Sequence, residues 1–133
     1  IAYNAIPSVV YTNPEIACIG LTEKDLNDIR EGDFAPTMSL DKPFVEYEVH
    51  QLPMTYSGRF VAENEGETGL CKVIVDKKNK TIIGVHMIGN PCSEFVAAAS
   101  FAVRMGYTVG EFKQVVFPHP TVGEVLREVI MES

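Results

Sequence analysis

The clearest alternation of apolar and polar positions lies in the middle of the chain. Two β-branched runs, LCKVIVD (70–76) and TIIGVHMIG (81–89), flank the polar segment KKNK (77–80). Such a pattern is typical of a β-hairpin. Just before it, the segment 46–55 alternates like an exposed strand, and we expect it to end in a turn at YSGR (56–59).

The first thirty residues predict two short strands and a helix. VVYT (9–12) and IACIG (16–20) are extended patterns with an Asn-Pro turn signal between them. TEKDLNDIR (22–30) begins with a threonine and acidic residues, spaces Leu26 and Ile29 three apart, and is followed by Gly32. These start and stop signals predict a short amphipathic helix.

The last third of the chain changes to helical spacing. VGEFKQVV (109–116) and TVGEVLREVIME (121–132) each predict a helix. A longer one ends before Gly106, and its apolar positions are Phe95, Ala98, Ala99, Ala102 and Met105. The order of strands and helices predicts an α+β domain, in which an antiparallel sheet carries helices packed to one side.

The alanine-rich helix before Gly106 allows two interpretations. Its small residues, Ala97 to Ser100, surround most of the helix. They fit packing onto the domain's own sheet, and they equally allow a second helix to approach closely, as a symmetric dimer contact requires.

Length and charge restrict the class of protein. The 133 residues suffice for one domain, so we assign residues 1–133 to a single unit. A net charge of −7 argues against nucleic-acid binding. The run FVAAASFAV (95–103) is about half as long as a bilayer requires, so no membrane span is expected. The chain does not begin with methionine, which predicts a piece of a longer protein.

The cysteines predict no disulfide chemistry within this chain. Cys18, Cys71 and Cys92 are widely spaced, and no CxxC or CxxxxC pair exists. Such a pattern favours reduced, partly buried thiols in a cytoplasmic protein. His50 is interpreted as a surface residue and His86 as a structural histidine in its strand, and no metal site is predicted.

The segment FPHPTVGE (117–124) contains the strongest candidate for chemistry. Pro120 pushes the backbone of His119 out of the helical region, and Pro118 fixes the approach to it. This stiffness suits a side chain that must point at something outside its own domain. His119 is therefore a candidate base.

Glu124 also allows two interpretations, which do not exclude each other. Thr121 and Glu124 have the S/T-x-x-E spacing of a capping box, in which the glutamate reaches back to the N-cap backbone. The same carboxylate is within reach of the His119 ring and would orient it as a base. The residues alone predict an oriented base and do not identify its substrate.

Four segments of this chain resemble a known family. IPSVVYTNPEIACIGLTEKDL (6–26), together with GVHMIG, SEFVAAA and FPHPTVGEVLRE further on, is similar to the C-terminal dimerisation domain of the pyridine nucleotide–disulfide oxidoreductases. The likeness covers nearly the whole chain and is greatest to the dihydrolipoamide dehydrogenases. Their upstream FAD and NAD domains and CxxxxC disulfide are absent from this sequence, which also contains no GxGxxG.

The resemblance implies roles for the candidate residues. The histidine at the position of His119 would act as the general base in the partner subunit's active site, paired with the glutamate at Glu124. The backbone of His119 and Pro120 would face the partner's FAD. The implied assembly is a homodimer, and the full-length enzyme would oxidise dihydrolipoamide with FAD and NAD. The resemblance also implies a 2-oxo acid dehydrogenase complex as its partner. This chain alone would be inactive.

Two departures and two alternatives accompany the resemblance. Many relatives have a second histidine where this chain has Phe117, and the segment 33–46 is longer than usual and is interpreted as a surface insertion. A glutathione-type or other NAD(P)H-dependent disulfide reductase is one alternative function. A non-catalytic dimerising module, in which HPTVGE is only a capped turn, is the other.

Overall fold

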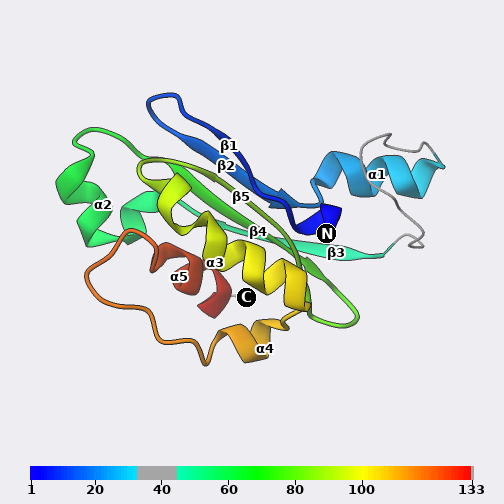
Figure 1. The fold of residues 1–133 in the computed structure, drawn as a ribbon. Helices are drawn as coiled ribbons and strands as arrows, with labels where there is room; N and C mark the ends of the chain where they lie inside the picture. Colours follow the sequence, from blue (N-terminus) through cyan, green and yellow to red (C-terminus); the bar gives the residue numbers. More distant parts are fainter. Residues whose placement is uncertain (33–44, 133) are drawn as a thin grey trace.

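The computed structural model describes residues 1–32 and 45–132, and these residues form a five-stranded antiparallel sheet with helices against it. The strand order is β1-β2-β5-β4-β3 (Figure 1). The bounds of the strands are β1 (Ser8–Val10), β2 (Ile16–Gly20), β3 (Tyr47–Leu52), β4 (Leu70–Asp76) and β5 (Ile82–Ile88).

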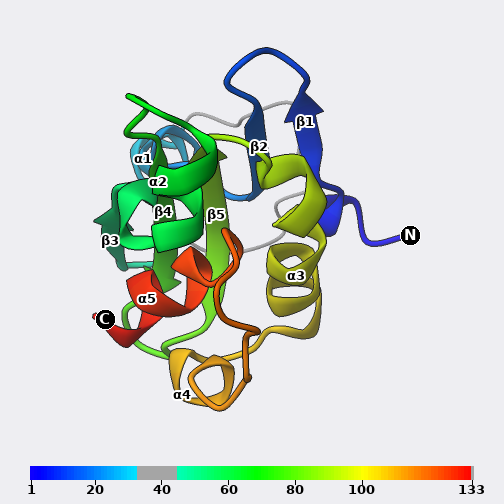
Figure 2. The ribbon, with the colours of Figure 1, turned by 90° about the vertical axis from the view of Figure 1, so that its left-hand side faces the viewer.

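Five helices are present in the described part of the chain, and two of them cover one face of the sheet. α3 packs against β2 and β5, and α5 packs against β3 and β4 (Figure 2). The bounds are α1 (Glu23–Glu31), α2 (Gly58–Glu63), α3 (Cys92–Met105), α4 (Val109–Phe112) and α5 (Val125–Met131), with 3₁₀ turns at Tyr3–Ala5 and Met54–Tyr56. The predicted α+β class is confirmed.

The register of the sheet separates its two faces. Residues directly opposite in an antiparallel pair point to the same side, so Cys71 lies beside Met87, and Val73 beside Val85. The face toward α3 and α5 is wholly apolar at its centre and buried, and it contains Ala17, Ile19, Cys71, Val73, Val75, Ile82, Val85 and Met87. The 70–89 hairpin predicted from the β-branched runs is confirmed.

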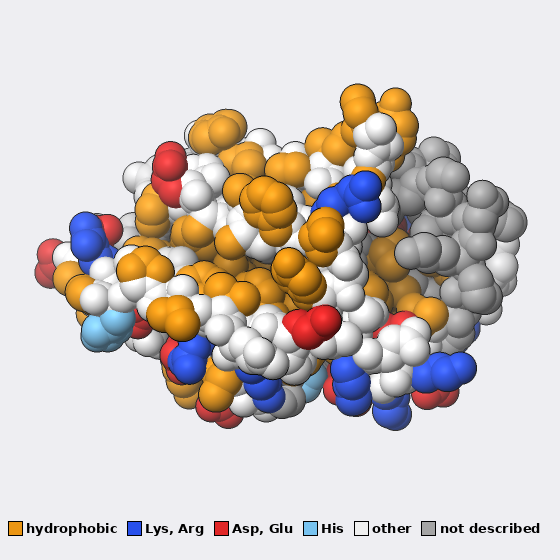
Figure 3. Space-filling view, turned by 60° about the horizontal axis from the view of Figure 1, so that its bottom comes forward, with side chains coloured by type: hydrophobic (Ala, Val, Ile, Leu, Met, Phe, Trp, Pro, Cys, Tyr) orange, Lys and Arg blue, Asp and Glu red, His pale blue; other side chains and the backbone are white. Residues whose placement is uncertain are grey.

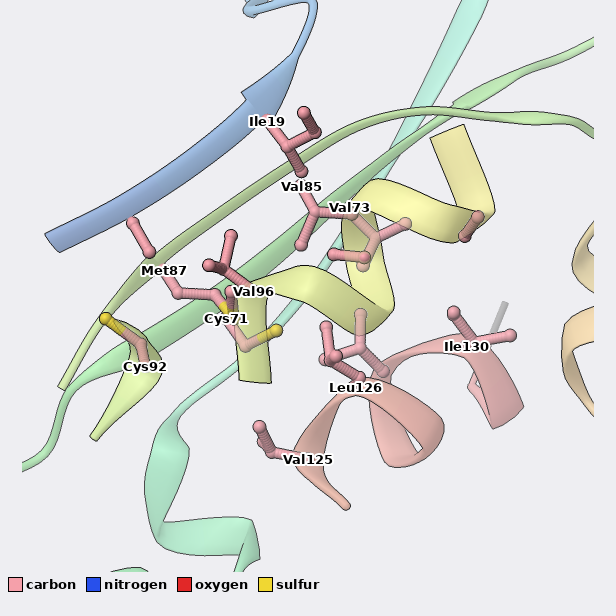
Figure 4. Close-up of a cluster of buried hydrophobic side chains, with 14 of the residues drawn as sticks. Ile19, Cys71, Val73, Val85, Met87, Cys92, Val96, Val125, Leu126 and Ile130 are labelled. Carbon is pink, nitrogen blue, oxygen red and sulfur yellow. The ribbon is translucent and has the colours of Figure 1, made fainter. Parts of the chain in front are cut away.

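The hydrophobic core fills the space between this face and the two helices (Figure 4). From α3 it receives Val96, Ala99 and Ala102, all at most 4% exposed. From α5 it receives Val125, Leu126, Val129 and Ile130. Each of the larger aliphatic side chains contributes about 1.5–3 kcal/mol by leaving water, so α5 is fixed firmly to the sheet.

The outward side of α3 differs from its inward side. Ala99 and Ala102 pack on the domain's own sheet, which confirms the first interpretation of the alanine-rich helix. Phe101 and Met105, by contrast, are 69% and 61% exposed. Met105 was expected on the same stripe as the buried alanines, and that expectation is wrong because the inward stripe runs through Val96 instead.

The opposite face of the sheet is partly covered by α1. Leu26 and Ile74 are fully buried yet lie outside the main core cluster. Lys72 pairs with Glu23 at 2.8 Å, which ties the start of α1 to β4. The helix has the predicted bounds, since Thr22 forms a complete capping box and Gly32 ends it in the left-handed conformation. Because α1 lies on the face opposite α3 and α5, the prediction that the helices all pack to one side of the sheet is wrong.

Two predicted boundaries differ from the structure. The expected turn at 56–59 is instead the beginning of α2, whose N-cap is Ser57. The helices expected at 109–116 and 121–132 are shorter, and they are α4 and α5. The helix-like spacing of both segments comes from turns that precede or follow a short helix. The segment interpreted as an insertion, 33–46, lies almost entirely outside the described residues.

Two glycines with positive φ provide a test of the packing. Gly20 has φ +77°, and a Cβ there would lie 2.3 Å from the Ile83 carbonyl oxygen, whereas Gly32 has φ +82° and open space around it. We expect Gly32→Ala to cost about 1–2 kcal/mol for the left-handed conformation alone. Gly20→Ala must cost more, because β5 has to move. Denaturant unfolding of both variants measures the difference, and equal losses would contradict the close approach of β2 and β5.

Candidate catalytic site

His119 lies in the connection between α4 and α5, on the surface of the domain. Its side chain is 78% exposed, and the flanking residues Pro118 and Pro120 are exposed as well. The connection runs as an extended orange segment in Figure 1. The imidazole is therefore presented outward, as the two prolines predicted.

The carboxylate of Glu124 holds the imidazole ring. His119 Nδ1 is 2.9 Å from Glu124 Oε1 and 3.0 Å from Oε2. Because an ionised carboxylate only accepts hydrogen bonds, Nδ1 carries the hydrogen of the neutral ring. The other nitrogen, Nε2, is then the one that can accept a proton. The side chain of Glu124 is only 12% exposed, so the carboxylate is far less accessible to solvent than the imidazole that it binds.

Glu124 also performs half of a capping box. Its Oε2 accepts the backbone N–H of Thr121 at 3.0 Å. The reciprocal bond is absent, since the Thr121 hydroxyl donates to the Pro118 carbonyl at 2.7 Å and α5 begins only at Val125. The contact between the carboxylate and the ring is therefore present, whereas the predicted capping box with Thr121 as N-cap is not formed, because the N-cap of α5 is Glu124 itself. One carboxylate nevertheless binds both the ring and the backbone N–H of Thr121.

Apolar contacts fix the rest of the segment to the domain. Val122 is 6% exposed and belongs to the core, and Val125 behind it is fully buried. Gly123 lies against Phe95 of α3, where an added Cβ would come within 3.3 Å of that side chain. The exposed histidine thus stands on a segment whose base is part of the hydrophobic core.

A surface groove of about 370 Å³ opens beside the histidine. It is lined by residues from the segment and from α5: Lys113, Gln114, Val115, Val116, Phe117, His119, Glu124, Arg127 and Glu128. Arg127 was not among the residues predicted for the site. Arg127 is three residues after Glu124, and this spacing places the two side chains on the same side of the predicted helix.

Phe117 anchors the segment that carries His119. Its ring lies 5.8 Å from that of Phe112, with an interplanar angle of 46°. Phe112 is 4% exposed and belongs to the core. Phe117 thus attaches the segment to α4 and carries no group able to transfer a proton.

The two other histidines lie in strands of the sheet, His50 in β3 and His86 in β5. His86 Nε2 lies 2.9 Å from the Leu21 carbonyl oxygen, and burial lowers the pKa of this ring. This agrees with a structural histidine. His50 is not the surface residue expected: its side chain is 23% exposed, and its Nε2 is buried 3.4 Å from a Glu48 carboxylate oxygen. The register of β3 turns it toward the core face, opposite Val73.

The cysteines are all free thiols, as predicted. Cys71 and Cys92 are buried near Met87 in the core (Figure 4), and Cys18 is half-buried. Burial raises the pKa of Cys71 to about 12 and that of Cys92 to about 11. Among the described residues, no three side chains of the metal-binding types converge. No helix of the described part is long and apolar enough to cross a membrane.

Comparison with known sequences identifies the class of domain. Residues 6–130 match the family described as "Pyridine nucleotide-disulphide oxidoreductase, dimerisation domain". The chain belongs to this family. Its relatives include the mitochondrial dihydrolipoyl dehydrogenase of Caenorhabditis elegans, 36% identical over 96% of this chain, and the dihydrolipoyl dehydrogenase of Thermus scotoductus, 35% identical over 92%.

The chain spans only about a quarter of the length of these relatives, 23% in both cases. Solved structures agree on the fold. LpdA from Mycobacterium tuberculosis superimposes with a TM-score of 0.79 at 22% identity, over 99% of this chain and 26% of that one. The flavoprotein disulfide reductase RclA from Escherichia coli gives 0.76 at 19% identity, over 95% of this chain and 26% of that one.

The buried thiols lead to a prediction about their reactivity. A thiol must ionise before it can be alkylated, and with a pKa of about 12 only about one Cys71 side chain in ten thousand is ionised at pH 8. We expect alkylation of Cys71 and Cys92 to be very slow in the folded protein and complete within minutes in denaturant. Mass spectrometry of iodoacetamide-treated protein measures this, and rapid labelling of Cys71 without denaturant would contradict its burial.

Proposed function

We propose that this chain is the dimerisation domain of a dihydrolipoamide dehydrogenase and that it supplies the general base of that enzyme. The observation that carries the proposal is the pair formed by the exposed ring of His119 and the largely buried, backbone-anchored carboxylate of Glu124. The names of the related proteins favour dihydrolipoamide as substrate. A base of this kind typically contributes about 10² to 10⁴ in rate.

His119 would take the proton from a thiol of the substrate. Nδ1–H is engaged by Glu124, so the proton goes to Nε2, and the carboxylate stabilises the positive charge that the ring acquires. The resulting thiolate is the nucleophile that attacks a disulfide. In the proposed enzyme that disulfide belongs to the partner subunit's upstream domains. The described residues of this chain contain no disulfide.

FAD and NAD would be held mainly by the upstream domains, and the resemblance assigns this chain one contact with the flavin. The backbone of His119 and Pro120 fits that contact because both residues are exposed. None of the described hydrogen bonds uses the His119 carbonyl oxygen, so it remains able to face a bound group. When bound, the flavin would receive the electron pair released by dithiol oxidation and pass it to NAD⁺.

The proposed homodimer is supported by the outward side of α3. Phe101 and Met105 are exposed there, and the 3₁₀ turn beside this helix contributes Tyr3, which is 76% exposed. Figure 3 shows apolar side chains gathered across the middle of one face of the domain. Large exposed apolar patches mark interaction sites, and a second copy of this domain would cover this one.

The location and the larger assembly of the full-length enzyme are also proposed. The cytoplasm is the proposed location, because three unpaired cysteines suit a reducing compartment. A 2-oxo acid dehydrogenase complex is the proposed larger assembly of the full-length enzyme. The glutathione-type reductase and the non-catalytic module are the alternatives, and both give different results in the following experiment.

We expect His119→Gln in the full-length enzyme to lower kcat for NAD⁺-linked dihydrolipoamide oxidation by about 10² to 10⁴, because the proton acceptor is lost. The fold should not change, since this side chain is 78% exposed. Steady-state kinetics of wild type, His119→Gln and the control His50→Gln measure the effect, with glutathione disulfide and NADPH as alternative substrates. Turnover that survives in His119→Gln would mean that the segment is only a capped turn.

Hybrid dimers test whether the base acts across the interface. One subunit would carry His119→Gln and the other would lack an upstream redox cysteine. If the base acts in trans, one of the two sites in each hybrid receives both defects and the other receives neither, so about half of the wild-type activity per dimer returns. If it acts within its own subunit, the hybrids stay inactive.

The proposed interface predicts a linked loss of assembly and activity. Phe101→Asp places a charge in the exposed apolar surface of α3, and burying an unpaired charge is strongly unfavourable. We expect the dimer to dissociate and the activity to fall in parallel. Sedimentation velocity and turnover at matched concentrations measure both. Gln51→Glu, on the exposed edge strand β3, adds the same charge and should leave the dimer intact.

A further inference from the structure

We infer that Ser57, at the start of α2, is a positioning residue for the His119–Glu124 pair. The inference rests on the proposed function and extends it to a residue that the sequence assigned to a turn. Ser57 and Asp76 are the buried polar or charged residues of the described chain, and Ser57 is completely inaccessible to solvent. Asp76 binds its own β4–β5 turn, whereas Ser57 reaches across the domain.

The hydroxyl of Ser57 makes two hydrogen bonds in opposite directions. It accepts the backbone N–H of Phe60 at 3.2 Å, which caps α2. It donates to the carbonyl oxygen of Thr121 at 2.8 Å, although the two residues are 64 positions apart. A helix cap needs only the acceptor. The donated hydrogen therefore has a different structural role, which is to hold the segment that carries the histidine.

The hydroxyl is well placed to act as a fixed point. Its neighbour in the cap, Phe60, is fully buried in the core and lies against Gly89. A buried hydroxyl without partners is costly, but here both its donor and its acceptor are used. Ser57 therefore transfers the rigidity of the core to the backbone of Thr121.

Thr121 connects this fixed point to the base. Its carbonyl accepts from Ser57, its N–H donates to Glu124 Oε2, and its hydroxyl donates to the Pro118 carbonyl. All three polar groups of the residue are thus fixed. Without the bond from Ser57, Thr121 and the carboxylate that it positions gain freedom, and the ring of His119 loses its fixed orientation.

The test uses the full-length enzyme and two variants that remove the hydroxyl. Ser57→Ala removes both hydrogen bonds, and Ser57→Gly does so with a smaller loss of helix capping, since glycine is a tolerated N-cap. We expect kcat for dihydrolipoamide to fall about tenfold in both, as small misplacements of a reacting group do. KM should stay within about twofold, because substrate binding is not the affected step. Ser57→Thr, which keeps the hydroxyl, should recover most of kcat.

Two further variants separate positioning from stability. Thr22→Ala removes the N-cap of α1, which has no connection to His119, and should lower the melting temperature without lowering kcat. If Ser57 acts through the carboxylate, adding Ser57→Ala to Glu124→Gln should reduce kcat no further. Independent, multiplying losses, or a Ser57→Gly enzyme as active as Thr22→Ala, would overturn the inference. Normal turnover in His119→Gln would instead refute the proposed function itself.

Discussion

The carboxylate of Glu124 is the contact on which the candidate site depends. It accepts hydrogen bonds from the imidazole of His119 and from the backbone of Thr121, and it is largely shielded from water while the ring is exposed. A long ion pair on an open surface would contribute little order. Here the acceptor is fixed first, by backbone and core, and the exposed ring takes its orientation from it.

The architecture of the domain explains why such a site can stand at its edge. One face of the sheet binds α3 and α5 through an apolar core, and the segment before α5 enters that core at Val122. The polar residues that follow the prolines are therefore attached to the most rigid part of the fold. The outward side of α3 remains apolar, and an exposed base on the same domain suits a site completed by another subunit.

Much of the fold and the site could be predicted from the sequence, and each wrong prediction has a physical cause. Caps and turns gave α1, the central hairpin and β2 within a residue, because local chemistry decides them. The spacing of His119 and Glu124 predicted their contact. The position of α2 was missed, since Pro53 and Gly58 suggest a turn, and its six residues are stabilised by burying Phe60 rather than by helix propensity. The environment of His50 depends on strand register, which one sequence does not specify.

The order of the elements along the chain has a consequence for biosynthesis. The strands β3 and β4 are covered by α5, which is synthesised long after them. His119 leaves the ribosome after these strands and before α5. During translation the core face of these strands lacks its cover, and the carboxylate that orients the base has not yet been fixed. A nascent chain therefore carries the histidine before the carboxylate that binds its ring is in place, and the His119–Glu124 pair forms together with the closing of the core.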